Sequence, residues 1–187
     1  SFAELEAELE AELEAELEAR RRQYAHYRDE LLSFAERESV SWLKLEDVCR
    51  IIGGKDYKHL GEGSIPVYGS GGIMSVSVDE AAYDKPTVLL PRKGSIGNVF
   101  YVDTPFWNVD TVFYTEIDTS MIVPRYQYHV VVNMHIERLN TSNAARPALT
   151  RNVLKQIELP VPALEEQERI VAILDKFDEL VNDVSQN

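Results

Sequence analysis

The sequence predicts an α+β fold, in which a mixed, twisted sheet is carried on two long terminal helices that form an antiparallel coiled coil. Three observations lead to this prediction. Residues 3–38 contain no proline or glycine and are rich in strong helix formers. Apolar residues near the end of the chain recur with the spacing of a coiled-coil seam. Between them, short apolar runs alternate with turn residues, which is typical of β structure. We therefore divide the chain into residues 1–40, 41–162 and 163–187.

The first segment is dominated by a repeat, because Ala-Glu-Leu-Glu occurs four times without interruption in residues 3–18. We expect one helix over residues 3–38, which each repeat lengthens by about 6 Å. Glutamates four residues apart repel one another, so this helix is expected to lie against a second helix. The alternative is an exposed, solubilising helix. The residues expected to pack are Leu5, Leu9, Leu13 and Leu17.

The last segment is expected to be helical from about Ala163, because Pro160 and Pro162 end the strand before it. Its apolar residues follow a 4-3-4-3 spacing, which indicates a coiled-coil seam. Two long helices from opposite ends of the chain can pack antiparallel on each other. The predicted seam consists of Ile170, Leu174, Phe177, Val181 and Val184.

The middle segment is predicted to be mainly β structure, with turns rich in glycine, proline and aspartate. A helix is expected over residues 124–139, since proline opens it and apolar residues follow at helical spacing. The predicted strands are residues 67–68, 73–78, 87–90, 98–102, 112–116 and 156–159.

The net charge of −13 is concentrated at the two ends of the chain. Residues 1–19 contain eight glutamates and no lysine or arginine, and residues 163–187 contain seven acidic and two basic residues. Residues 20–162 hold 17 acidic and 17 basic residues, so they are neutral overall. The middle segment is therefore able to present a basic face to a partner such as nucleic acid.

Several classes of function are disfavoured. No apolar run approaches the roughly 18 residues of a membrane span, and the acidic start lacks the features of a signal peptide. The single Cys49 allows no internal disulfide, so we expect a cytoplasmic protein. The four histidines lack metal-ligand spacing, and no nucleophile elbow or phosphate-binding loop occurs. We therefore predict no catalytic residue, no metal site and no cofactor.

Basic and small polar residues gather in the predicted turns, and these are the residue types that contact phosphates and base edges in DNA. We expect the lysines and Arg92 mainly to anchor phosphates. The candidates for base contacts are Ser70, Asn98, Asn140, Ser142 and Arg146. Ordinary turns with solvated charges are the alternative interpretation. The predicted DNA-binding set is Lys55, Lys58, Tyr68, Ser70, Arg92, Lys93, Ser95, Asn98, Asn140, Ser142, Arg146 and Arg151.

Six stretches, in their order along the chain, carry a family resemblance. They are residues 20–32 (RRRQYAHYRDELL), 65–74 (IPVYGSGGIM), 90–97 (LPRKGSIG), 106–111 (FWNVDT), 139–150 (LNTSNAARPALT) and 159–167 (LPVPALEEQ). Together they resemble one half of a specificity subunit of a type I restriction–modification system. The resemblance covers nearly the whole chain.

The resemblance implies a target-recognition domain over residues 41–162 that reads half of a split DNA site, with the coiled coil setting the half-site distance. Family members carry tetrapeptide repeats in the central helix, and most have two recognition domains. One domain here implies a half-subunit, whose homodimer would favour an inverted-repeat site. The implied partners are double-stranded DNA, methyltransferase subunits that use S-adenosylmethionine, and a restriction subunit. The implied candidates for methyltransferase docking, or for the coiled coil itself, are Tyr24, Tyr27 and residues 163–184, with simple packing as the alternative for both tyrosines.

Two other interpretations stay open on the residues alone. The first alternative is a coiled-coil dimerisation adaptor that does not read DNA. The second is a small-molecule or phosphate-binding enzyme that uses its glycine-rich turns. Equal affinity for random and selected DNA would favour the adaptor. Thermal stabilisation by a nucleotide would favour the enzyme.

Overall fold

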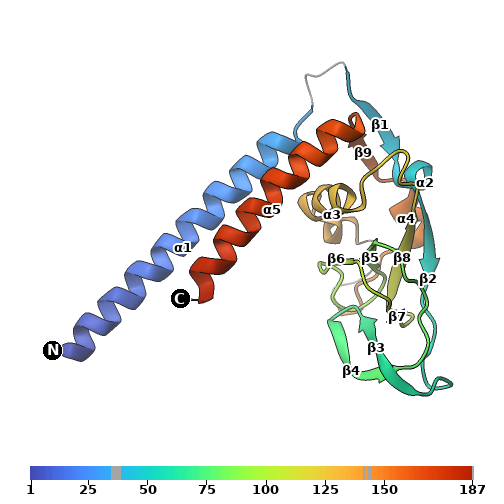
Figure 1. The fold of residues 1–187 in the computed structure, drawn as a ribbon, viewed down its shortest axis with the longest axis horizontal. Coiled ribbons are helices and arrows are strands. Elements are labelled where there is room, and N and C mark those ends of the chain that lie inside the picture. Colours follow the sequence, from blue (N-terminus) through green and yellow to red (C-terminus); the bar gives the residue numbers. More distant parts are fainter. Residues whose placement is uncertain (35–38, 141, 143–144, 187) are drawn as a thin grey trace.

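A computed structural model describes residues 1–34, 39–140, 142 and 145–186, and the side chains of residues 184–186 lie outside this description. Two long helices, α1 (Phe2–Leu32) and α5 (Leu164–Gln186), run antiparallel and form a stalk (Figure 1). The remaining elements form a domain at one end of the stalk, and both chain termini lie toward its other end (Figure 1). The predicted α+β class and the antiparallel pair of terminal helices are confirmed.

Helix α1 ends earlier than its composition predicts. It begins at a capping box in which the Ser1 hydroxyl accepts from the backbone N–H of Glu4. It ends at Leu32, because Ser33 is extended (φ −88°, ψ 110°) and Phe34 enters the core with 2% of its surface exposed. The expectation of helix through Ser33 and Phe34 is therefore wrong, since burial of an aromatic ring outweighs helix propensity there. The predicted residues 35–38 lie outside the described residues.

The stalk helices pack through aromatic and aliphatic side chains. Ile170 and Leu174 of α5 are buried, and the Phe177 ring lies against Tyr24 and Tyr27 of α1, with centroid distances of 5.4 and 5.7 Å. Val181 is half-buried against the same core. The seam residue Val184 lies outside the described side chains. One seam of α5 thus joins the stalk to the core.

The repeat leucines are not covered within this chain. Leu5, Leu9 and Leu13 are 55, 53 and 52% exposed, and Leu17 is half-buried. The first part of α1 extends past the end of α5 (Figure 1). Helix α5 of the same chain therefore does not cover Leu5, Leu9 and Leu13. Their packing on a second helix stays a prediction, and it concerns a helix from another chain.

The described residues of the domain form three sheets. A two-stranded antiparallel sheet pairs β1 (Ser41–Lys44) with β9 (Glu158–Val161). An antiparallel sheet has the order β2-β8-β5-β6 and contains β2 (Cys49–Gly53), β8 (Val112–Ile117), β5 (Thr87–Pro91) and β6 (Phe100–Val102). A mixed sheet has the order β4-β3-β7 and contains β4 (Gly72–Val78), β3 (Glu62–Gly69) and β7 (Trp107–Asn108), with β3 and β7 parallel.

Short helices complete the domain: α2 (Leu45–Val48), α3 (Pro124–Asn133), the 3₁₀ helix η1 (Ile136–Leu139) and α4 (Arg151–Lys155). The main core is formed by the four-stranded sheet, α3, α4 and the domain end of the stalk. Tyr126 of α3 lies at its centre, fully buried, and its hydroxyl donates to the carbonyl of Pro160 at 2.7 Å. Stalk and domain therefore share one core.

Several predicted elements differ in their limits: the strand expected over residues 67–68 is β3 (Glu62–Gly69), and the strand expected over residues 98–102 begins at Phe100. The helix expected over residues 124–139 is interrupted, because His135 adopts a left-handed conformation (φ 52°) that brings the following Ile136 into the core. The last strand begins at Glu158 rather than at Gln156 and includes Pro160. Proline is tolerated there because its strand belongs to a two-stranded sheet and lies at an edge.

A polar junction fixes α5 to both α3 and α1. Buried His129 lies with Nε2 2.8 Å from Asp175 Oδ1, and Arg125 Nε donates to the same oxygen at 2.9 Å. The Tyr24 hydroxyl donates to Asp178 one turn further along. Burial lowers the pKa of His129, against the opposing effect of Asp175, and burial raises the pKa of Tyr24 to about 12.

The junction predicts a pH dependence of stability. The pKa of His129 is lower in the folded state than in the unfolded chain, so the unfolded chain binds more protons below about pH 6.5. The free energy of unfolding is therefore expected to fall as pH falls below that value. It is also expected to fall above about pH 10, because Tyr24 then ionises only when unfolded.

Thermal unfolding of the chain and of His129→Gln between pH 5 and 8 measures the acidic part of this dependence. The difference between their melting temperatures is expected to narrow as pH falls, since only the original chain has this histidine to protonate on unfolding. If the melting temperatures of the two chains changed in parallel with pH, His129 would not be the source of the acidic pH dependence.

Candidate nucleic-acid interface

Two turns that are distant in sequence meet at the tip of the β3–β4 hairpin. Asn98 Nδ2 donates to the Ser70 carbonyl at 3.0 Å, and the Ser95 N–H donates to Ser70 Oγ at 3.4 Å. Gly94 lies beside them with φ 77°, and a Cβ at this position would be 2.8 Å from Ser70 Oγ. The positive φ of Gly94 favours glycine, and a Cβ there would force the Ser70 hydroxyl to shift. Three residues of the predicted DNA-binding set thus form one cluster.

Thr111 ties this hairpin tip to the loop that follows β5. The Ser70 N–H donates to Thr111 Oγ1 at 3.2 Å, and the Arg92 N–H donates to the Thr111 carbonyl at 2.9 Å. Both turns are therefore held to the same residue before β8. Backbone hydrogen bonds of this kind reduce the freedom of the two turns and position their side chains.

Arg92 and Arg151 are brought together over one aromatic ring. Their guanidinium carbons lie 5.7 and 5.6 Å from the centroid of Phe113. The Leu149 N–H donates to the Arg92 carbonyl at 2.8 Å, which places the start of α4 beside the Arg92 loop. With Lys93, these residues line a cavity of about 340 Å³. Three cations of the predicted DNA-binding set therefore lie on one surface, although they come from segments far apart in the chain.

A second cavity, of about 370 Å³, continues from Arg151 along β2. It adds Arg50 and Lys155, which the sequence analysis did not select. Arg50 is an exposed residue of a strand that the analysis did not predict, and Nη1 lies 3.0 Å from Glu116 Oε2. Lys155 lies in the single short turn of α4. The alternation of apolar, basic and apolar residues at Cys49, Arg50 and Ile51 is the sequence signal that could have indicated Arg50.

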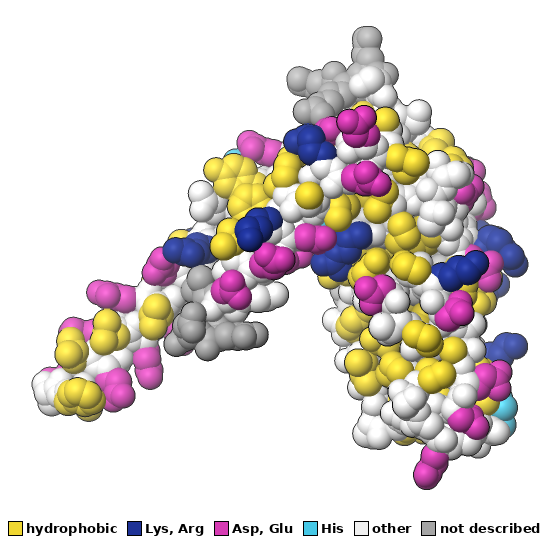
Figure 2. Space-filling model, in the orientation of Figure 1, with side chains coloured by type: hydrophobic (Ala, Val, Ile, Leu, Met, Phe, Trp, Pro, Cys, Tyr) yellow, Lys and Arg dark blue, Asp and Glu magenta, His cyan; other side chains and the backbone are white. Residues whose placement is uncertain are grey.

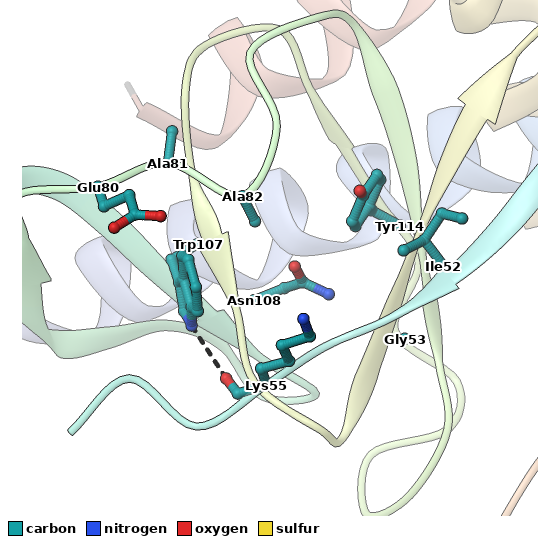
Figure 3. Close-up of a pocket in the computed structure, with 9 residues that line it drawn as sticks. All are labelled: Ile52, Gly53, Lys55, Glu80, Ala81, Ala82, Trp107, Asn108 and Tyr114. Atoms are coloured by element: carbon teal, nitrogen blue, oxygen red, sulfur yellow. Dashed lines mark hydrogen bonds between the residues drawn. The ribbon is translucent and has the colours of Figure 1, made fainter. Parts of the chain in front are cut away.

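Lys55 points into a different, smaller cavity of about 240 Å³ (Figure 3). Its carbonyl accepts from Trp107 Nε1 at 2.9 Å, and its side chain extends toward Asn108 (Figure 3). Glu80 lines the same cavity. Lys58 is exposed in the loop that follows Lys55. The two lysines are thus apart from the cavity shared by Arg92 and Arg151.

The remaining predicted residues have structural partners. Tyr68 is half-buried against Phe100 and Phe106, and this burial raises its pKa. Asn140 Oδ1 accepts from the Ser142 N–H at 3.1 Å and from the Ala148 N–H at 3.2 Å. Its acceptor therefore organises the loop.

The hydroxyl of Ser142 lies 2.6 Å from the Arg146 carbonyl, and Arg146 is exposed in the same loop. This loop leads directly into the segment that carries Arg151.

The surface charge is divided between the domain and the stalk. Figure 2 shows Lys and Arg side chains at the edge of the domain along which β2 runs, with acidic side chains among them. The free end of the stalk carries acidic and apolar side chains (Figure 2). A polyanion would therefore be repelled more strongly by the acidic stalk end than by this edge of the domain.

The described residues contain one group with metal-ligand spacing: His129, Asp175 and Asp178. Arg125 and Tyr24 already donate to these carboxylates. The group therefore suits a junction between helices better than a cation site. None of the helices that the structure describes is long and apolar enough to cross a membrane.

Residues 38–187 match the family model of the type I restriction modification DNA specificity domain. The chain is 33% identical over 99% of its length to the specificity subunit of the Escherichia coli type I restriction enzyme EcoprrI, covering 48% of that protein. It is 32% identical over 89% of its length to a putative type I specificity subunit of Mycoplasma pneumoniae, covering 60% of that protein. The chain thus spans about half the length of these curated relatives.

Solved structures share the fold. The S subunit of a type I system from M. genitalium has a TM-score of 0.76 and 21% identity, over 94% of this chain and 52% of that one. The HsdS subunit from Thermoanaerobacter tengcongensis has a TM-score of 0.72 and 18% identity, over 98% of this chain and 49% of that one.

These findings define the chain as a DNA specificity domain of a restriction–modification system. It belongs to the type I restriction modification DNA specificity domain family, whose members are non-catalytic.

Proposed function

We propose that this chain reads one half of a split DNA target for a type I restriction–modification complex and carries out no chemistry itself. The observation that carries the proposal is the gathering of Arg92, Lys93 and Arg151 beside the cluster of Ser70, Ser95 and Asn98. Cations anchor phosphates, and hydroxyl and carboxamide groups read base edges. The domain of residues 41–162 would read the DNA, and residues 1–40 and 163–187 would form the stalk.

We further propose that two copies assemble through their stalks. The chain spans about half of its relatives, and Leu5, Leu9 and Leu13 form an exposed stripe on α1. A second copy would cover this stripe and supply a second reading domain, and the two-fold symmetry would favour an inverted-repeat target. The length of α1 would then set the distance between the half-sites.

The partners would be double-stranded DNA, methyltransferase subunits that bind S-adenosylmethionine, and a restriction subunit in the cytoplasm. Such subunits would dock on the stalk, where Tyr27 is 39% exposed, whereas Tyr24 is buried against Phe177 and packs within the stalk. The alternative of a dimerisation adaptor remains a separate candidate, favoured by the exposed leucine stripe alone.

Adenine methylation in cells that express the chain with its methyltransferase subunits tests the proposed function. We expect a methylated inverted repeat with a fixed spacer, and light scattering is expected to give twice the mass of 21.3 kDa for the chain. One added Ala-Glu-Leu-Glu repeat should lengthen the spacer by about two base pairs, since about 6 Å of helix matches about 6.8 Å of DNA. Methylation without a motif, or equal binding to random and selected DNA, would favour the adaptor.

A further inference from the structure

The outer face of β4 carries a short uncharged row at the edge of the mixed sheet. Exposed and covered residues alternate along this strand, and the exposed residues are Ile73, Ser75 and Ser77. Ile73 is 66% exposed, although it is fully apolar. Edge strands in proteins are commonly protected by charged side chains or proline. This edge strand has neither, which indicates a surface that a partner covers.

The hairpin tip next to Ile73 is held in place. Ile73 lies opposite Tyr68 in the β3–β4 register, and the Tyr68 ring packs against Phe100 and Phe106. The tip residue Ser70 accepts hydrogen bonds from Ser95 and Asn98, and its N–H donates to Thr111. Because the tip is ordered before any partner binds, Ile73 can contact a ligand with little loss of conformational freedom.

The charge around the tip favours nucleic acid as the partner. Gly94 lies against Ser70, and the cations of the same loop, Arg92 and Lys93, precede it directly. Uncharged apolar and hydroxyl groups thus lie beside phosphate-binding cations. The floor of the major groove presents the same pattern, since base edges and thymine methyl groups lie between two phosphate backbones. The acidic residues Asp79 and Glu80 follow β4 at its other end, so the contact is confined to the tip half.

The dimensions of the strand also match DNA. Alternate residues of a strand are about 6.6 Å apart, and two base-pair steps rise about 6.8 Å. A two-stranded ribbon is narrow enough to enter the major groove. A ribbon that runs along the groove would therefore place Ile73 and Ser75 two base pairs apart.

We propose that the β3–β4 hairpin enters the major groove and that Ile73 specifies a thymine by contact with its methyl group. Ser75 then contacts a base edge two pairs away. This inference rests on the proposed DNA-reading function and identifies the element and the base feature that it uses.

Removal of one methyl group from DNA tests the proposal. The recognised sequence is first taken from the methylation motif, and each thymine in it is replaced singly by uracil in synthetic duplexes. The complex of the chain with its methyltransferase is expected to lose about fourfold in affinity at one position, which corresponds to one buried methyl group. Ile73→Ala is expected to lose the same affinity on the thymine duplex, with no further loss on uracil. Ser75→Ala should relax base preference two pairs away.

Met134→Ala is the matched control, because it also shortens an exposed apolar side chain, at the C-cap of α3 rather than on the hairpin. It should keep the full difference between thymine and uracil. Three outcomes would overturn this inference alone. They are an unchanged sequence preference in Ile73→Ala, a recognised half-site that contains no thymine, and self-association of the chain that Ile73→Lys abolishes. Equal affinity of the unsubstituted chain for selected and random DNA would overturn the proposed function as well.

Discussion

Replacement of Gln167 by alanine is expected to lower the free energy of unfolding by about 3–5 kcal/mol. This side chain is fully buried at the start of α5. Its Nε2 donates to the carbonyls of Met121 at 3.0 Å and Pro162 at 2.8 Å, and its Oε1 accepts from the Val123 N–H at 2.8 Å. The substitution leaves three backbone groups without a partner, and each costs about 1–3 kcal/mol when it is buried.

Urea unfolding of the chain measures this effect. Gln167→Met separates hydrogen bonding from volume, since it fills most of the space but restores none of the three bonds. It is expected to destabilise nearly as much as alanine. The exposed Gln156→Ala is the control, with an expected change below about 0.5 kcal/mol. A loss of less than 1 kcal/mol for Gln167→Ala would contradict the argument.

Joint replacement of Arg92 and Arg151 by alanine is expected to weaken DNA binding at least about tenfold and to reduce the slope of log affinity against log salt by about 2. Both guanidinium groups lie over Phe113 and line the same cavity, so they are placed to contact neighbouring phosphates. Each phosphate contact contributes about 0.9 to the slope. The loss should be similar for all sequences, because phosphates carry no base identity.

Salt-dependent binding of the chain to a duplex measures both quantities. The matched control replaces Arg21 and Lys176 of the stalk by alanine, which changes the net charge equally. The control is expected to keep the slope. An unchanged slope in the Arg92 and Arg151 variant would show that these residues do not contact phosphates. The double replacement by lysine should keep the slope and lose only the interaction with the ring.

The sequence was sufficient for the elements with strong periodicity. Helix α5 and the strands over residues 73–78, 87–90 and 112–116 lie close to where they are predicted, and α1 lies within its predicted range except at its ends. The predicted ends of helices were wrong where a long-range contact overrides a local preference, as at Phe34 and Ile136. Strands β1, β2 and β7 were missed. Strand β1 exposes Trp42 and β7 has two residues, so neither of these two gives a clear alternation.

For the candidate site, the sequence identified residue types but not their grouping. Arg92 and Arg151 are far apart in the chain and meet only because the Leu149 backbone pairs with Arg92. Gln167 gave no signal, since a glutamine near a helix start is usually an exposed residue. Its role depends on three backbone groups from two other segments, and no spacing rule relates these to one another.

The continuous α1 helix also has a rotational consequence. Four residues turn an α-helix by about 400°, which is about 40° beyond one full turn. Two base pairs turn DNA by about 70°. One added repeat would therefore leave two reading domains out of phase with the grooves by about 30°, even where the distance fits. Twisting of the stalk or of the spacer DNA has to absorb this angle, and the mismatch grows with each repeat.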